Sequence, residues 1–139
     1  MGNAEYICFT NNDVLFQQGF VANSCQLLAD SLYDVLSVKN QHGFIHPEII
    51  SGFCFVMRRS AWNKIGKLNT DYKFWCADNV TSEQMCAYGL KEYKSDIQVT
   101  HLTSVSLNYL DGATREDYTR KCVKQFNKDY NKNVLGMGI

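Results

Sequence analysis

The sequence predicts a single α/β domain of 139 residues, with a mixed central sheet flanked by helices. Strongly apolar runs alternate along the chain with amphipathic helical patterns, which is how helices come to cover a sheet. The composition is that of a folded globular chain, since 45% of the residues are hydrophobic and 13% are aromatic. No repeat or linker-like stretch interrupts the chain, so we expect residues 1–139 to form one domain.

The sheet is expected from strands near 6–10, 51–58 and 92–100. The run from Ser51 to Met57 is almost unbroken in its apolar character, as in a central strand that is covered on both faces. The last of the three regions is predicted as two short strands that turn through Ser95 and Asp96. Residues 37–49 are predicted as a loop.

Two long helices, near 23–36 and 114–129, are expected to pack on this sheet. Asn23 can cap the first, and the second has a predicted buried stripe that consists of Tyr118, Cys122, Phe126 and Tyr130. A short helix is predicted from Arg58 to Ile65, where Gly66 ends it. Another is predicted at 80–88, with Thr81 and Gln84 at capping-box spacing and Gly89 as its stop.

The charge balance narrows the class of partner. The net charge is +0, which removes the electrostatic case for nucleic-acid binding. No apolar run has the length of a membrane span, so we expect no membrane span and a cytoplasmic location. The 6 cysteines form no C-x-x-C pair and are interpreted as reduced structural thiols.

Residues Asn11-Asn12-Asp13 directly follow the strand expected at 6–10. A carboxylate at the C-terminal end of a buried strand faces the crevice in which open α/β sheets bind ligands. Carboxylate and amide oxygens form a hard cluster that suits Mg²⁺ or Mn²⁺ better than zinc. The same three residues are also typical of a turn, because Asn and Asp bond their own backbone. The residues alone leave a metal site and a simple turn as two interpretations.

Three further features follow in order along the chain. Gly52 lies in the apolar strand, Asp78 follows an aromatic segment and enters a helix, and His101 ends the last strand. With the first motif, their order and spacing resemble the second half of the inverting glycosyltransferases of family 2, which have the GT-A fold. That family has a strand leading into a D-x-D metal motif, a glycine strand, an aromatic loop with an acidic residue, and a strand ending in histidine. The resemblance covers roughly residues 4–107.

The resemblance implies a role for each matching residue. Asn11 and Asp13 match the ends of the D-x-D motif, and His101 matches a histidine that is a metal ligand in some relatives. The implied cofactor is Mn²⁺ or Mg²⁺, which bridges the diphosphate of a nucleotide-diphospho-sugar donor. Asp78 matches the general base that takes the proton from an acceptor hydroxyl, either of a saccharide or of another acceptor.

Asn12, Gly52 and Trp75 are implied to contact the substrate, with the Trp75 ring stacked on a sugar. Simpler interpretations exist for the same residues. Asp78 is also a preferred helix cap, and Trp75 also fits a core or rim aromatic. Three residues depart from the family pattern and bear on metal affinity and acceptor geometry. Asn11 is a neutral ligand, Ala77 stands where an acidic residue usually precedes the base, and Val80 replaces the second Asp that is common after the base.

Length is the largest departure from the family. Only five residues precede Tyr6, whereas the family places its nucleotide-binding strands before the D-x-D strand. The resemblance therefore implies a truncated GT-A domain, the catalytic and acceptor half without most of the donor half. The absent neighbour would leave an unpaired sheet edge, so we expect self-association or a second chain to cover it.

The predicted function is metal-dependent transfer of a sugar, with inversion, from a nucleotide-diphospho-sugar to an acceptor hydroxyl. One alternative is a non-catalytic remnant of the same fold that binds sugar or a partner chain. Another is an unrelated α/β binding domain. Diphosphate-dependent Mn²⁺ binding separates the first from the second.

Overall fold

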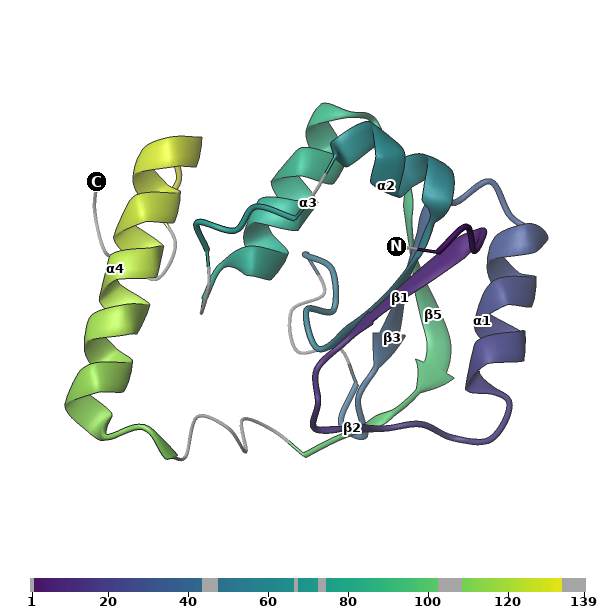
Figure 1. The fold of residues 1–139 in the computed structure, drawn as a ribbon, viewed down its shortest axis with the longest axis horizontal. Coiled ribbons are helices and arrows are strands. Elements are labelled where there is room, and N and C mark those ends of the chain that lie inside the picture. Colours follow the sequence, from purple (N-terminus) through teal and green to yellow (C-terminus); the bar gives the residue numbers. More distant parts are fainter. Residues whose placement is uncertain (1, 44–47, 67, 73–74, 103–108, 134–139) are drawn as a thin grey trace.

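The structure is a computed structural model, and it describes residues 2–43, 48–66, 68–72, 75–102 and 109–133. It has the mixed α/β architecture that the sequence predicts, with a mixed sheet and flanking helices (Figure 1). Among the described residues, no helix combines the length and the apolar character that crossing a membrane requires.

The main sheet has four strands in the order β1-β4-β3-β5. Their bounds are β1 Tyr6–Thr10, β3 Val35–Lys39, β4 Cys54–Arg58 and β5 Glu92–Gln98. Strand β4 is antiparallel to both β1 and β3, while β3 and β5 are parallel. Strands β1, β3 and β5 therefore share one direction, and their carboxyl ends lie at the same edge of the sheet. A second sheet pairs β2 (Val14–Leu15) with β6 (Thr100–His101).

Helices cover both faces of the main sheet. The helix α1, Phe20–Ala29, covers one face through Leu28, which packs with Leu36 and Val56 in one hydrophobic cluster. The opposite face is covered by α2, Arg59–Ile65, and by α3, Ala77–Ala87. The first four residues of β3 and of β4 are buried. For β4 this matches the prediction of a central apolar strand near 51–58.

The helix α4, Gly112–Tyr130, corrects a prediction, because its apolar side chains do not pack on the sheet. They form a separate cluster in which Val123 and Phe126 pack against Tyr72, Cys76 and Val80. Figure 1 shows α4 at the left, beside α3 and on the far side of the molecule from α1.

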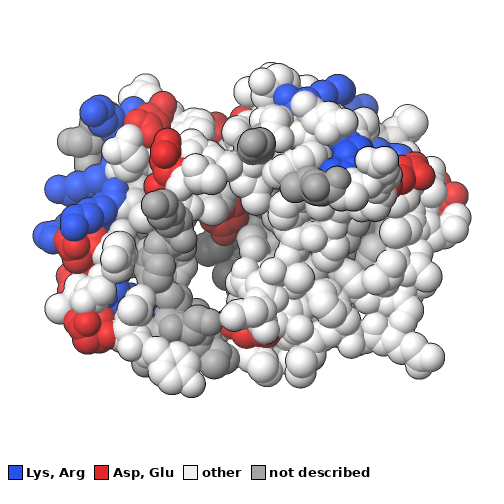
Figure 2. All heavy atoms as spheres, in the orientation of Figure 1, with Lys and Arg blue, Asp and Glu red and all other residues white. Residues whose placement is uncertain are grey.

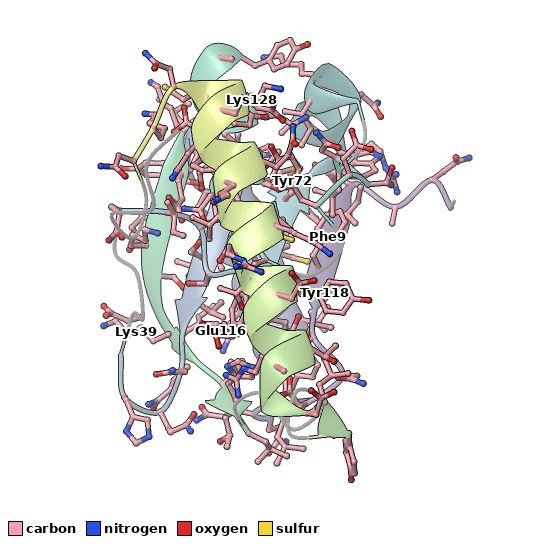
Figure 3. All side chains as sticks on the ribbon, turned by 90° about the vertical axis from the view of Figure 1, so that its left-hand side faces the viewer. Phe9, Lys39, Tyr72, Glu116, Tyr118 and Lys128 are labelled. Carbon is pink, nitrogen blue, oxygen red and sulfur yellow. The ribbon has the colours of Figure 1, made fainter. Side chains whose placement is uncertain are left out.

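The predicted buried stripe of α4 was wrong in part. Tyr118 is 48% exposed, and the buried residues are Val123, Phe126 and Asn127. The helix begins earlier than predicted, because the Asp111 side chain caps it by accepting a hydrogen bond from the Thr114 backbone N–H at 2.9 Å. Figure 3 looks onto this helix, with Tyr72 beside its C-terminal half.

The first predicted helix, 23–36, was wrong beyond Ala29, and the predicted loop at 37–49 was wrong at its start. Residues 35–39 form the central strand β3, flanked on both sides by partners that supply its hydrogen bonds. The apolar spacing misled because Leu32, which continues the helical stripe in the sequence, is 90% exposed. Pairing with β4 and β5, together with the strand preference of its β-branched valines, makes this segment a strand and not a helix.

Three local predictions also fail. Ser95 and Asp96 lie inside the continuous strand β5, where the buried Ser95 hydroxyl donates to the Ser37 carbonyl at 2.9 Å. An irregularity in the β3–β5 register stands where a turn was expected. Thr81 lies within α3 and donates to the Ala77 carbonyl, so it is no cap. Gly19, not Asn23, stands at the N-terminus of α1.

Candidate functional site

The site predicted from the sequence lies at the carboxyl edge of β1, β3 and β5. Hydrogen bonds join the chain segments that meet there. The Asn11 N–H, just after β1, donates to the Phe53 carbonyl at 2.9 Å, and the Ser51 hydroxyl donates to the Val38 carbonyl at 2.8 Å. The Ser51–Phe53 turn before β4 is thereby fixed between the ends of β1 and β3. Ligands of open α/β sheets bind at such carboxyl edges.

Asp13 and His101 meet at this edge. The small β2–β6 sheet brings them together, since Val14 pairs with His101 and the Leu102 N–H donates to the Asp13 carbonyl at 2.9 Å. The Asp13 Oδ1 and His101 Nε2 atoms are 3.2 Å apart. Both side chains are nearly buried, at 10% and 9% exposure respectively. Two residues 88 positions apart in the chain are therefore in direct contact.

The backbone and ring of His101 are held by their neighbours. Gln41 bonds the backbone twice, donating to the His101 carbonyl at 3.0 Å and accepting from its N–H at 2.9 Å. The Phe53 ring stacks on the imidazole with centroids 4.8 Å apart and planes at 16°. The His101 backbone is thus held by Gln41, and stacking on Phe53 sets the plane of the ring.

The pair leaves polar atoms unsatisfied. Asp13 Oδ1 and both ring nitrogens of His101 are buried without a hydrogen bond to any described residue. The 3.2 Å approach brings the two groups close without the alignment of a hydrogen bond. Buried polar atoms are nearly always satisfied, so unpaired ones call for an unseen ligand or a functional role.

These donors fit a divalent cation. Cis ligands of an octahedral ion with bonds near 2.1 Å lie about 3 Å apart, close to the separation of Asp13 Oδ1 and His101 Nε2. The described residues contain no group of three or more His, Cys, Asp or Glu side chains that could hold a metal. Ions such as Mg²⁺ and Mn²⁺ commonly use one or two protein ligands and complete their shell with water and substrate phosphates. Asn11 and Asn12 are exposed beside the pair.

Asp78 lies against Gly52 on the other side of the same turn. Asp78 is in the first turn of α3, and its Oδ1 accepts from the Asn79 N–H at 3.0 Å. A Cβ added at Gly52 would fall 2.7 Å from Asp78 Oδ2 and 2.8 Å from Asp78 Cβ. Only glycine leaves room for this carboxylate, so Gly52 determines where Asp78 can lie.

The structure therefore gathers four of the predicted residues around one turn. Gly52 contacts Asp78, and the next residue, Phe53, contacts His101, which in turn contacts Asp13. Figure 2 shows a hollow in the surface between α4 and the sheet, with acidic side chains above and below it.

Trp75 lies apart from this group. It is half-buried and packs against the cluster of Tyr72, Cys76, Val80, Val123 and Phe126, in the position of a rim aromatic. Burial, followed by the negative charge of Asp78, raises the pKa of the Cys76 thiol to about 11. Cys76 is therefore a protonated neighbour of Asp78 at neutral pH, and not a thiolate.

Sequence reasoning missed two residues that shape the site. Phe53 was assigned only to the apolar strand, although its place directly after Gly52 puts it at the strand end. Gln41 fell in the predicted loop at 37–49, and nothing in the sequence connects it with His101. His42 lies in the short turn between Asn40 and Gly43, whereas His46 lies outside the described residues.

No protein-family model matches this sequence, and no curated protein matches it either.

Proposed function

We propose that this chain carries the metal-binding and acceptor-activating part of an inverting glycosyltransferase that uses a nucleotide-diphospho-sugar donor. The observation that supports this most strongly is the buried Asp13–His101 contact, whose polar atoms lack partners among the described residues at the carboxyl edge of the sheet. Asp78, on the other side of the Ser51–Phe53 turn, adds a second carboxylate with a separate task.

Asp13 and His101 would hold Mn²⁺ or Mg²⁺. When bound, the cation would offset the negative charge that grows on the departing nucleotide diphosphate. Their part is to present one carboxylate oxygen and one imidazole nitrogen in a nearly water-free setting. Gln41 holds the His101 backbone and the Phe53 ring stacks on the imidazole, which lowers the cost of ordering His101 when a ligand arrives.

Asp78 would act on the acceptor. Its carboxylate takes the proton from the acceptor hydroxyl as that oxygen attacks the anomeric carbon of the donor sugar. The bond from the anomeric carbon to the diphosphate breaks, and the nucleotide diphosphate leaves with the electron pair. Attack from the face opposite the leaving group inverts the anomeric configuration. Asn12, which precedes Asp13, would contact the donor, whereas Trp75 packs against the cluster around Phe126 and is not assigned a sugar contact.

The second candidate is a non-catalytic relative of this fold that binds sugar or a partner chain. It is favoured by the neutral Asn11 at the first position of the metal motif and by the small number of metal-binding side chains among the described residues. Such a protein would hold a cation weakly and without dependence on a diphosphate.

Electron paramagnetic resonance of free Mn²⁺ tests the proposal. We expect the protein to bind Mn²⁺ more tightly when UDP is present, because phosphate oxygens complete the metal shell. Asp13→Ala and His101→Ala should each reduce this binding by tenfold or more, an effect typical of losing a metal contact. Asp78→Asn should leave it unchanged, and Asp71→Asn, an exposed aspartate, is the matched control.

Mn²⁺ binding that does not respond to UDP, or that survives Asp13→Ala, would contradict the transferase proposal and favour the non-catalytic alternative. Where transfer is assayed with a sugar nucleotide, Asp78→Asn should lower turnover by about 10²–10⁴-fold while Mn²⁺ affinity stays intact.

A further inference from the structure

A second groove lies away from the Ser51–Phe53 turn, between α1 and the C-terminal part of β5. It has a volume of about 640 Å³, within the range of small-ligand sites. Residues before and within α1 form one wall, and Tyr93 to Gln98 of β5 form the other. Neither Asp13, His101 nor Asp78 lines it.

Side-chain amides dominate the polar lining. They belong to Gln17, Gln18, Asn23, Gln26 and Gln98. The side chains of Gln17, Gln18 and Asn23 make no hydrogen bond within the described part of the chain. Gln26 and Gln98 use only Nε2, which donates to Asp30 at 2.7 Å and to the Asn40 carbonyl at 3.1 Å, so their Oε1 atoms are available. An amide both donates and accepts, as a hydroxyl group does.

Apolar and aromatic surface accompanies the amides. Phe20, Leu27, Tyr93 and Ile97 contribute it, from both walls. The Tyr93 ring is fixed by Tyr33, which stacks on it with centroids 5.1 Å apart and planes at 28°. A fixed aromatic ring beside amide groups can contact the apolar face of a ring-shaped ligand and bond its polar rim.

The charge of the groove excludes anionic ligands. None of the residues that line it is a lysine, an arginine or a histidine. Its one carboxylate, Asp96, forms an ion pair with Lys39, which lies outside the lining. The hydrogen bond and charge of Lys39 also hold the pKa of Asp96 below its usual value. The lining residues offer a nucleotide or phosphate no cation, and Lys39 beside them is paired with Asp96, whereas a neutral polyhydroxylated ligand would find donors, acceptors and an aromatic face.

We propose that this groove binds a neutral saccharide, at a site separate from the Asp13–His101–Asp78 edge. The proposal does not depend on sugar transfer at that edge. A saccharide held along α1 and β5 would lie next to the carboxyl ends of the strands, because Gln98 ends β5 just before His101.

Nuclear magnetic resonance titration of the full chain with cellotetraose, maltotetraose and chitotetraose tests this inference. We expect saturable shifts of the side-chain amide signals of Gln17, Gln18 and Asn23 with at least one of the three. Gln18→Ala combined with Asn23→Ala should weaken that binding tenfold or more. Both side chains are exposed and make no bond within the described residues, so the fold should persist. Gln125→Ala, an exposed glutamine on α4, is the matched control.

The inference is overturned if none of the three probes gives saturable shifts, or if the double variant binds as tightly as the parent. Loss of binding in Asp78→Asn would also overturn it, because the saccharide would then occupy the edge around Gly52. A negative saccharide titration says nothing about UDP-dependent Mn²⁺ binding, which tests the proposed transferase. The two proposals can therefore fail separately.

Discussion

The sheet and the α4 region are built in different ways. In the β1-β4-β3-β5 sheet, the central strands β4 and β3 are buried on both faces and pair on both sides. In contrast, the contacts of α4 with other described residues are one small cluster around Phe126 and side-chain contacts such as Tyr72 with Asp129 and, just after the helix, Lys132 with Glu83. The buried Asp13–His101 pair lies at the end of the well-paired region.

The difference indicates which parts of the site are rigid. Asp13 and His101 are held by strand pairing, stacking and backbone hydrogen bonds, so their geometry should persist without a ligand. Asp78 lies at the start of α3, whose Val80 packs toward α4 while Met85 packs on the sheet. In the proposed transferase, Asp13 and His101, which would hold the metal, therefore belong to the sheet. Asp78, which would act on the acceptor, borders the region around α4.

The largest expected loss of stability comes from a substitution in the core of the sheet. Leu36→Ala removes a side chain that is 0% exposed in β3 and should lower the free energy of unfolding by about 2–5 kcal/mol. Urea unfolding followed by circular dichroism measures it, and Leu32→Ala, at a residue 90% exposed, should change it by less than about 0.5 kcal/mol.

Phe126→Ala sharpens the same comparison. It should raise amide hydrogen exchange in α4 while the exchange of β3 and β4 stays near that of the parent, because local units open independently of the core. If Phe126→Ala unfolds the sheet as readily as Leu36→Ala, the two regions form one cooperative unit and the comparison fails.

A smaller effect on the stability of α4 is expected from removing the hydrogen bond between Tyr72 and Asp129. The Tyr72 hydroxyl donates to Asp129 at 2.7 Å, and bonds from Gln125 and Tyr72 hold the pKa of Asp129 below its usual value. The stability that the ionised Asp129 adds to the folded state is fully present above the unfolded pKa of Asp, about 4. It is lost as the pH falls through the lowered pKa of the folded state. Burial and the same bond raise the pKa of Tyr72, so its contribution is present below about pH 10 and is lost above it.

Tyr72→Phe should therefore lower the protection factors of the α4 amides a few-fold at pH 7. It should also remove part of the further loss of protection on acidification to pH 3, because Gln125 still bonds Asp129. Phe cannot donate to Asp129, yet it keeps the ring that packs edge-on against Phe126. An unchanged acid response in Tyr72→Phe would assign that response to another carboxylate.

The sequence predicted most of what depends on local burial. The strands at 6–10 and 54–58 and the helix from Arg59 to Ile65 follow from apolar runs, and Gly66 ends that helix as expected. Strand β3 was missed because Leu32 continues a helical spacing that the fold leaves in solvent. The partner of α4 was missed because an amphipathic pattern shows that a helix has an apolar face, but not which surface covers it.

The site was predictable where it depends on strand ends. Asp13, Asp78 and His101 each stand at the end of a strand or the start of a helix, which is where side chains face a crevice. The role of Gly52 could not be derived from the sequence, because the close approach of Asp78 depends on how α3 meets the turn before β4. Gln41 was hidden for the same reason, since its contact with His101 joins segments 60 positions apart.

The central claim is that Asp13 and His101 together hold a cation that a donor diphosphate also binds. A crystal grown with Mn²⁺ and a UDP-sugar, with data collected at the manganese absorption edge, tests it most directly. We expect one anomalous peak in contact with Asp13 Oδ1 and His101 Nε2, with diphosphate oxygens on the metal and the sugar facing Asp78. A peak bound elsewhere, or a sugar nucleotide bound away from the Ser51–Phe53 turn, would contradict it.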